Sequence, residues 1–347
     1  MTSVFRRTLP ALVLLLATCS RGFSQESPPL PESIPEPVAS PTTTPTTSPS
    51  TGATDAASTI RQPTKFEPSV TIDEVRPHIE FLASEELRGR QGRDALRAGQ
   101  YLIEQFQQCG LKPLFGDSFG QPIPGPKTKE GAETYYGKNI GAVLPGSDPL
   151  LRDEFVIISA HFDHLGVRNG VVYRGADDNA SGTSMMLALA RRFSQLKTAP
   201  KRSVVFIGFD LEEHLLWGSR WFVAHPPWPI KQVKFFMTAD MIGRSLGNLP
   251  LSTVFVLGSE HGTGLDEVLE PRGLNIARMG IDLIGTRSDY GPFRDRDIPF
   301  LFFSTGEHPD YHKPTDVPER IDYEQVARVS SLVEQVVLKI ADRDEAL

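Results

Sequence analysis

Four apolar runs of this chain each lead into acidic residues or histidine. Side chains of these types bind metal ions or transfer protons, and their repeated position behind an apolar run is hard to explain by packing. The repetition indicates a metal-dependent hydrolase. The runs and their polar followers are 155–160 with His161, 203–209 with Glu212 and Glu213, 233–239 with Asp240, and 298–303 with His312.

The candidate metal ligands contain no cysteine, which favours zinc, manganese or cobalt over an iron–sulfur cluster. Catalytic zinc takes about three protein ligands plus water. The candidate set therefore serves two ions, roughly 3.5–4 Å apart, if one carboxylate bridges them. Two divalent cations outweigh the carboxylates by about one charge, which lowers the pKa of a shared water. The candidates are His161, Asp177, Glu213, Asp240 and His312.

Residues beside these candidates receive supporting roles. Glu212 is expected to take a proton from the attacking water and pass it to the leaving amine. Asp163, two residues after His161, is expected to orient that imidazole. Asp178 follows Asp177 and is expected to cap the next helix or fix the local backbone. Structural roles are also expected for His164, His214 and His308.

The elements that position these residues alternate between strand and helix from about residue 139 onward. The apolar runs are continuous, which is typical of parallel strands covered on both faces. This pattern predicts an α/β fold: a single doubly wound, mostly parallel sheet with helices on both faces, whose ligands bind at the carboxyl ends of the strands. Further strands are expected at 139–144 and 253–257, helices at 72–82, 95–109, 184–196, 264–269 and 322–340, a kink or break at Pro77, and a long surface loop at 116–136.

Charge and cysteine content exclude some classes of protein. The formal net charge of −7 over 347 residues leaves no basic patch for a nucleic-acid partner. Two cysteines are too few for a disulfide framework. Cys109 ends an amphipathic pattern before Gly110 and is expected to be a buried structural thiol.

The first 65 residues differ in composition from the rest. Arg6 and Arg7 precede an apolar stretch too short for a stable membrane anchor, so 1–24 is predicted to be an export signal. Cys19 lies in a sequence resembling a bacterial lipoprotein box, so we expect a periplasmic, cell-envelope lipoprotein or secreted protein. Residues 25–65, rich in Pro, Ser and Thr, are expected to form a disordered linker, and 66–347 the catalytic domain.

Taken in order, the motifs resemble those of the secreted co-catalytic di-zinc aminopeptidases, the leucyl-aminopeptidase-like enzymes of clan MH. The resemblance extends from about residue 70 to residue 340. Any one motif is weak, but the ordered set is specific. The motifs are His161-x-Asp163, Gly-Ala-Asp-Asp-Asn-Ala-Ser-Gly at 175–182, Glu212-Glu213, Asp240-Met-Ile-Gly243, Ser288-Asp289 and Tyr311-His-Lys-Pro-Thr-Asp316.

The resemblance implies a zinc-exopeptidase or phosphorylase-hydrolase-like fold and two Zn²⁺ per chain, with Mn or Co as substitutes. It implies that His161 and Asp240 hold one zinc, Glu213 and His312 the other, and that Asp177 bridges them. It also implies that Glu212 is the general base and that Tyr311 stabilises the tetrahedral intermediate. Tyr290 stands where many relatives carry His.

Surplus acid near the metals suits capture of a free amine, whereas capture of a free carboxylate calls for an arginine fork. We therefore expect a monomeric enzyme that removes single N-terminal residues from peptide substrates, with apolar residues preferred if Met241 and Tyr290 line the pocket. Arg244 and Arg287 leave room for a carboxypeptidase instead. The same motifs are also compatible with a single-zinc, glutaminyl cyclase-like enzyme and with a catalytically silent binding relative.

Overall fold

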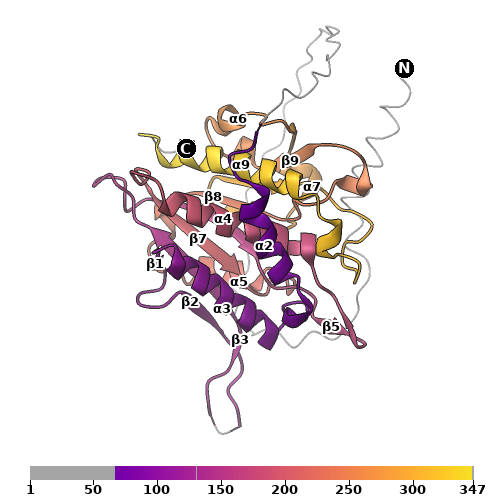
Figure 1. Ribbon diagram of the computed structural model, residues 1–347. Coiled ribbons are helices and arrows are strands. Elements are labelled where there is room, and N and C mark those ends of the chain that lie inside the picture. Colours follow the sequence, from indigo (N-terminus) through magenta and orange to yellow (C-terminus); the bar gives the residue numbers. More distant parts are fainter. Residues whose placement is uncertain (1–66, 130, 346–347) are drawn as a thin grey trace, which may run out of the picture.

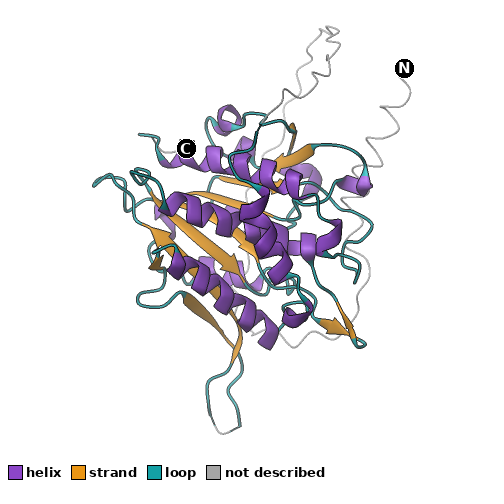
Figure 2. Ribbon diagram, in the orientation of Figure 1, coloured by secondary structure: helices purple, strands orange, loops and turns teal. Residues whose placement is uncertain are grey.

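The computed structural model describes residues 67–129 and 131–345. These residues form a central sheet with helices on both of its faces (Figures 1 and 2). The predicted α/β fold with one doubly wound, mostly parallel sheet is confirmed. The predicted export signal and linker lie outside the described residues.

Within the described residues the sheet has nine strands in the order β1-β3-β7-β4-β8-β11-β9-β10, and β2 pairs with β3. The strands β7, β4, β8 and β11 run parallel to one another, so their carboxyl ends meet at one edge of the sheet. The bounds are β1 (Lys112–Pro113), β2 (Gly120–Pro124), β3 (Tyr135–Leu144), β4 (Phe155–His161), β7 (Ser203–Phe209), β8 (Val233–Ala239), β9 (Thr253–Leu257), β10 (Asn275–Met279) and β11 (Phe300–Ser304).

The segment 116–136 is not the continuous loop that the sequence predicted. Its part Gly120–Pro124 forms β2, which pairs antiparallel with β3. The strand contains Pro122 and Pro124, which cannot donate to a neighbouring strand. Proline is tolerated in an edge strand such as β2, and its presence disguises the strand in the sequence.

Helices cover the two faces of the sheet unequally. Successive residues of β4 point to opposite sides, so Val156 and Ile158 join one hydrophobic core while Ile157 joins the other. The larger core lies under α2, α3, α4 and α9, and α2 packs against both α4 and α9. The smaller core lies under α5, α7 and α8. Their bounds are α2 (Ile72–Leu82), α3 (Arg93–Gln108), α4 (Gly182–Ser194), α5 (Trp217–Ala224), α6 (Leu265–Val268), α7 (Ile281–Ile284), α8 (Tyr290–Arg294) and α9 (Tyr323–Ala341).

Local sequence signals fix several helix ends. The Glu74 carboxylate accepts the backbone N–H of Thr71 at 2.8 Å, which begins α2. Pro77 lies within α2, but the helix runs unbroken from Ile72 to Leu82, so the expected break is absent. The Asp322 side chain accepts the backbone N–H of Gln325 at 3.0 Å and caps α9, as the sequence predicts.

Short elements complete the chain. A small two-stranded sheet of β5 (Val167–Arg168) and β6 (Val171–Val172) follows β4. Among the described residues, no helix is both long and apolar enough to cross a membrane. Single turns are η2 (Glu85–Leu87), η3 (Ala176–Ser181), η4 (Ile230–Gln232), η5 (Leu246–Asn248), η6 (Ser259–His261) and η7 (Pro318–Arg320).

Candidate metal centre

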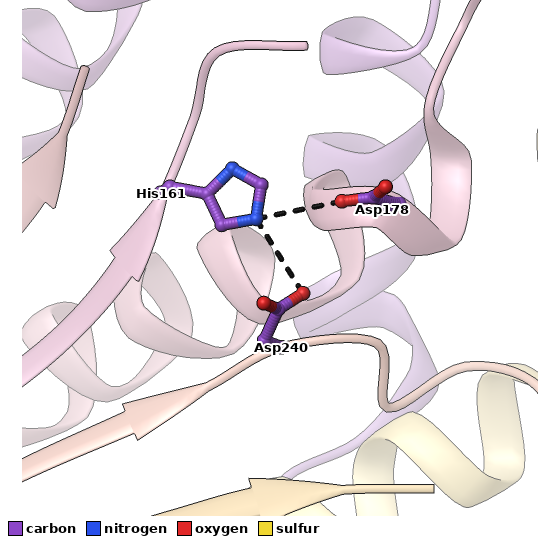
Figure 3. Close-up of side chains that lie close together, drawn as sticks. All are labelled: His161, Asp178 and Asp240. Carbon is purple, nitrogen blue, oxygen red and sulfur yellow. Dashed lines mark ion pairs between the residues drawn. The ribbon is translucent and has the colours of Figure 1, made fainter. Parts of the chain in front are cut away.

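One group of donor atoms forms where β4 and β8 end. His161 is the last residue of β4, and Asp240 directly follows β8. The His161 Nε2 atom lies 3.4 Å from Asp240 Oδ1 and 3.4 Å from Asp178 Oδ1 (Figure 3). All three residues are buried. The group thus unites residues from three segments of the chain around a common point.

A second group lies on the other side of Asp178. His312 Nε2 lies 3.1 Å from Asp178 Oδ2 and 3.3 Å from Glu213 Oε2. His164 Nδ1 lies 2.9 Å from Glu213 Oε1 and 3.7 Å from Asp178 Oδ2. Asp178 therefore offers one carboxylate oxygen to each group, the arrangement required of a bridging ligand.

Asp177, the predicted bridge, points away from both groups. Its Oδ1 accepts the backbone N–H of Gly243 at 2.6 Å, and its Oδ2 lies 3.3 Å from His308 Nε2. The next residue, Asp178, has non-helical dihedral angles of φ −103° and ψ 97°, which aim the neighbouring side chains in different directions. The structure thus moves the candidate bridging position from Asp177 to Asp178, where only a structural role was expected.

Two buried side chains hold the turn that carries Asp178. The Asp316 carboxylate accepts the backbone N–H groups of Asp177, at 2.9 Å, and of Asp178, at 3.1 Å. Arg90 is fully buried, and its guanidinium donates to the carbonyl oxygens of Phe162 at 2.7 Å and Gly175 at 2.8 Å. The turn is therefore tied both to the end of β4 and to the loop after His312.

Asp163 faces His161, which it was expected to orient, and it also contacts the backbone of both glutamates. Its Oδ1 lies 3.6 Å from His161 Nδ1, which is long for a hydrogen bond. Its two oxygens instead accept the backbone N–H groups of Glu212 at 3.1 Å and Glu213 at 3.3 Å. Asp163 therefore fixes the backbone from which both glutamates project.

The charges of the site are strongly coupled. Burial raises the pKa of Glu213, but His164 and His312 outweigh it and hold that pKa at about 2. Burial lowers the pKa of His312, but Asp178 and Glu213 raise it to about 11. Burial, reinforced by neighbouring carboxylates, raises the pKa of Glu212 well above its ordinary range. A proton on His312 thus offsets the charge of Asp178 and Glu213, and a divalent cation that binds here would displace it.

The two groups fit zinc. Donor atoms of His161, Asp178 and Asp240 lie within 4.8 Å of one another, and so do those of His164, Asp178 and Glu213. Among the described residues, no hydrogen-bond partner reaches Nε2 of His161, the ring nitrogen that faces Asp178 and Asp240. Buried polar atoms without partners are costly, and metal coordination is one way to satisfy them. Imidazole and carboxylate are normal ligands of catalytic zinc.

A cavity of about 220 Å³ opens beside the two groups. Glu212, Asp240 and Tyr311 line its polar side, and the Tyr311 ring stacks on His312 at a centroid distance of 3.9 Å. Met241 lines the cavity as expected, whereas Tyr290 is buried behind the wall. Apolar side chains also line it: Phe255, Leu257, Met279, Ile284 and Phe302.

Sequence reasoning missed three residues of this centre. It gave structural roles to Asp178 and His164, which join the donor groups, and it gave no role to Arg90. The short interval between His161 and His164 was the available signal for His164. The adjacent aspartates at 177 and 178 are chemically identical, so sequence alone offered no basis for choosing between them.

Comparison with known proteins relates the chain to peptidases and to cyclases. It is 27% identical over 260 residues to the aminopeptidase YwaD of Bacillus subtilis, a match that covers 67% of this chain and 54% of that protein. The chain therefore spans about half the length of that relative. The LapA aminopeptidase structure from Legionella pneumophila is similar in fold, with a TM-score of 0.62 at 20% identity over 80% of this chain and 72% of that chain.

Cyclases share this fold. The glutaminyl cyclase structure from Porphyromonas gingivalis gives a TM-score of 0.62 at 18% identity, over 78% of this chain and 98% of that chain. Similarity of fold alone thus does not separate hydrolysis from cyclisation. The family is nonetheless defined by sequence: residues 139–337, more than half of the chain, match the model of peptidase family M28, and the chain belongs to this family.

Proposed function

We propose that this chain is a zinc-dependent exopeptidase that removes single residues from the N-terminus of peptides. The observation that carries the proposal is the position of Asp178 between two donor groups, with Glu212 on the wall of the adjoining cavity. Membership of a peptidase family supports hydrolysis of a peptide bond.

In this proposal His161 and Asp240 hold one zinc ion, Glu213 and His312 hold the other, and Asp178 is shared. Two such ions, when bound, would polarise the scissile carbonyl group and lower the pKa of the attacking water. The chain supplies their positions through rigid elements, because His161 and Asp240 lie at the ends of adjacent parallel strands.

Glu212 is the proposed general base. Its carboxylate lines the cavity and its side chain is 12% exposed, so it can reach a substrate while remaining largely shielded. It takes the proton of the attacking water and delivers it to the nitrogen of the leaving amine. Asp163 holds the backbone of Glu212 in place for both transfers.

Tyr311 is proposed to stabilise the developing oxyanion. It lines the same cavity and stacks on His312, so its ring is positioned next to a proposed metal ligand. A phenolic hydroxyl that donates to an oxyanion stabilises the transition state in which the negative charge develops.

The acidic wall favours an N-terminal amine over a C-terminal carboxylate. Asp178, Glu212 and Asp240 all line the cavity, and they attract an ammonium group. Arg244 donates to Asp310 at 3.0 Å and is absent from the cavity lining, so it is not available to bind a substrate carboxylate there. Arg287 does line the cavity and is the group that a carboxypeptidase would use, but the carboxylates of the lining outnumber it. The apolar remainder of the wall favours an apolar N-terminal residue.

A set of three peptides tests this function. The first is N-acetylated, the second is C-amidated with a free N-terminus, and the third begins with glutamine. We expect cleavage of the second and no cleavage of the first, with two zinc ions per chain. Cleavage of the acetylated peptide would overturn the proposal. Release of ammonia from the third without hydrolysis would identify a cyclase.

We also propose that the protein is exported and carries a lipid on Cys19. The apolar stretch next to this cysteine motivates the proposal. Intact-mass analysis of membrane-extracted protein decides the question, because an unmodified Cys19, or a mature chain that lacks it, excludes the anchor.

A further inference from the structure

One wall of the cavity rests on the buried side chain of Tyr290, the first residue of α8. The Tyr290 hydroxyl accepts the backbone N–H of Arg287 at 3.0 Å and donates to the carbonyl oxygen of Gly285 at 2.5 Å. These two partners flank Thr286, and both Thr286 and Arg287 line the cavity. Through these two hydrogen bonds, the Tyr290 hydroxyl ties the loop 285–287 to α8.

The Tyr290 ring supports a second part of the same wall. It stacks on Phe300 with a centroid distance of 5.0 Å and an interplanar angle of 4°, and it lies 5.0 Å from the ring of Phe302. Phe302 belongs to β11 and lines the cavity. One side chain thus joins the loop to the strand, and both face the cavity from the apolar side.

The fit between this loop and α8 is close. A Cβ atom on Gly291 would lie only 2.3 Å from Cγ2 of Thr286, so the missing side chain makes room for Thr286. Gly285 has a φ of +69°, in the left-handed region that favours glycine. The loop therefore packs on α8 in one well-defined conformation, which the hydrogen bonds of the Tyr290 hydroxyl stabilise.

We propose that Tyr290 is a positioning residue that sets specificity for large apolar N-terminal residues. The inference rests on the proposed exopeptidase function. With the loop fixed, the wall exists before the substrate arrives, and binding need not order it. In this proposal the side chain of an N-terminal leucine contacts the wall, and the shorter methyl group of alanine does not. A preorganised wall therefore improves the binding of peptides with N-terminal leucine and does not change the binding of peptides with N-terminal alanine.

Removal of the hydroxyl tests the proposal while the ring is kept. Tyr290→Phe removes the partner of both the Gly285 carbonyl and the Arg287 N–H in a part-buried contact, so the loop loosens. The expected result is a fall of about 3- to 10-fold in kcat/KM for a peptide with N-terminal leucine, mainly through KM, because the two hydrogen bonds that hold the loop are lost. The alanine peptide is expected to change by less than about 2-fold.

Tyr323→Phe is the matched control. Tyr323 is also a buried tyrosine whose hydroxyl donates to a backbone carbonyl, that of Pro318 at 3.1 Å, but it lies outside the cavity. This variant is expected to leave the leucine-to-alanine ratio unchanged. Equal losses for both peptides in Tyr290→Phe, or an unchanged ratio, would overturn the specificity role.

A second measurement does not depend on activity. Hydrogen exchange of a peptide fragment spanning residues 281–290 is expected to be faster in Tyr290→Phe than in the wild type. Unchanged exchange shows that the hydroxyl does not hold the loop and overturns the proposal. If the wild type releases no N-terminal residue while exchange still increases, the exopeptidase function fails and the loop-fixing role of Tyr290 stands.

Discussion

The backbone N–H of Asp178 donates to the Asp316 carboxylate across a separation of 138 residues, at 3.1 Å. Asp316 lies on the loop that carries His312, so this bond fixes two candidate zinc ligands relative to each other. Hydrogen bonds within the protein thus set their relative positions. The sites are therefore expected to accept metal without rearrangement of the loop, which lowers the entropy lost on binding.

The two adjacent aspartates are expected to behave differently. Asp178→Asn should lose both zinc ions and all measurable peptidase activity, because Asp178 faces both donor groups. Asp177→Asn should retain metal, since Asp177 contacts Gly243 and His308 instead. Metal analysis of the purified variants checks the assignment, and the opposite pattern would return the bridging role to Asp177.

The two adjacent glutamates form a second pair. Glu212→Gln should keep both metals and lose on the order of 10²- to 10⁴-fold in kcat, the usual contribution of general acid–base catalysis. Glu213→Gln should lose metal from one site, because its carboxylate lies between His164 and His312. Zinc content measured alongside kcat separates the two roles. If the Glu212 variant lost zinc and the Glu213 variant kept both zinc ions, Glu212 would be the metal ligand and Glu213 the general base.

His164 allows a test of how Glu213 is held. His164→Ala removes the group 2.9 Å from Glu213 Oε1 and should weaken binding of one zinc ion by about 10- to 100-fold, as loss of such a supporting contact does. His164→Asn keeps an N–H donor near the same place and should recover most of that affinity. Chelator competition measures both. If Asn fails as badly as Ala, His164 is itself a zinc ligand.

Acid should destabilise the protein partly through His78. Its Nδ1 lies 2.6 Å from the Tyr101 hydroxyl, and burial, with Arg191, lowers its pKa from 6.5 to about 4. The unfolded chain therefore takes up this proton first, so the contribution of His78 to stability is complete above pH 6.5 and declines as the pH falls towards 4. The decline is on the order of 2–3 kcal/mol.

Urea unfolding across this pH range tests the effect of His78. His78→Gln cannot titrate, so its free energy of unfolding should fall less steeply between pH 6.5 and 4 than that of the wild type. Tyr101→Phe is the control for loss of the hydrogen bond without loss of the titrating ring. Parallel profiles for the wild type and His78→Gln would show that His78 does not titrate in this range.

Most of the sheet and the place of the site were predictable from local patterns. Continuous apolar runs mark the buried parallel strands, and parallel strands place their carboxyl ends together. That geometry brings His161 near Asp240 and places Glu213 near His312, as the sequence predicted. The apolar run at 253–257 likewise predicted β9, and its predicted and observed bounds agree.

The remaining features depend on contacts between distant residues or on backbone angles. The direction of Asp177 and Asp178 follows from dihedral angles within η3, which no residue type dictates. Arg90 looks like a surface residue in sequence, and only the fold surrounds it with carbonyl groups. Tyr290 was a candidate for the pocket lining because it follows the motif Ser288-Asp289, but it is buried beneath the wall, at the start of α8.

The packing of α2 against α9 has a consequence for biosynthesis. The backbone N–H of Val70 donates to Ser331 Oγ at 2.9 Å across 261 residues of sequence, and Arg192 on α4 bonds to both Glu74 and Glu334. The first described helix can therefore pack on α4 early, but its second partner, α9, is available only after the ribosome has released that helix. Contacts of such long range form slowly. The larger core thus cannot be completed until α9 has left the ribosome.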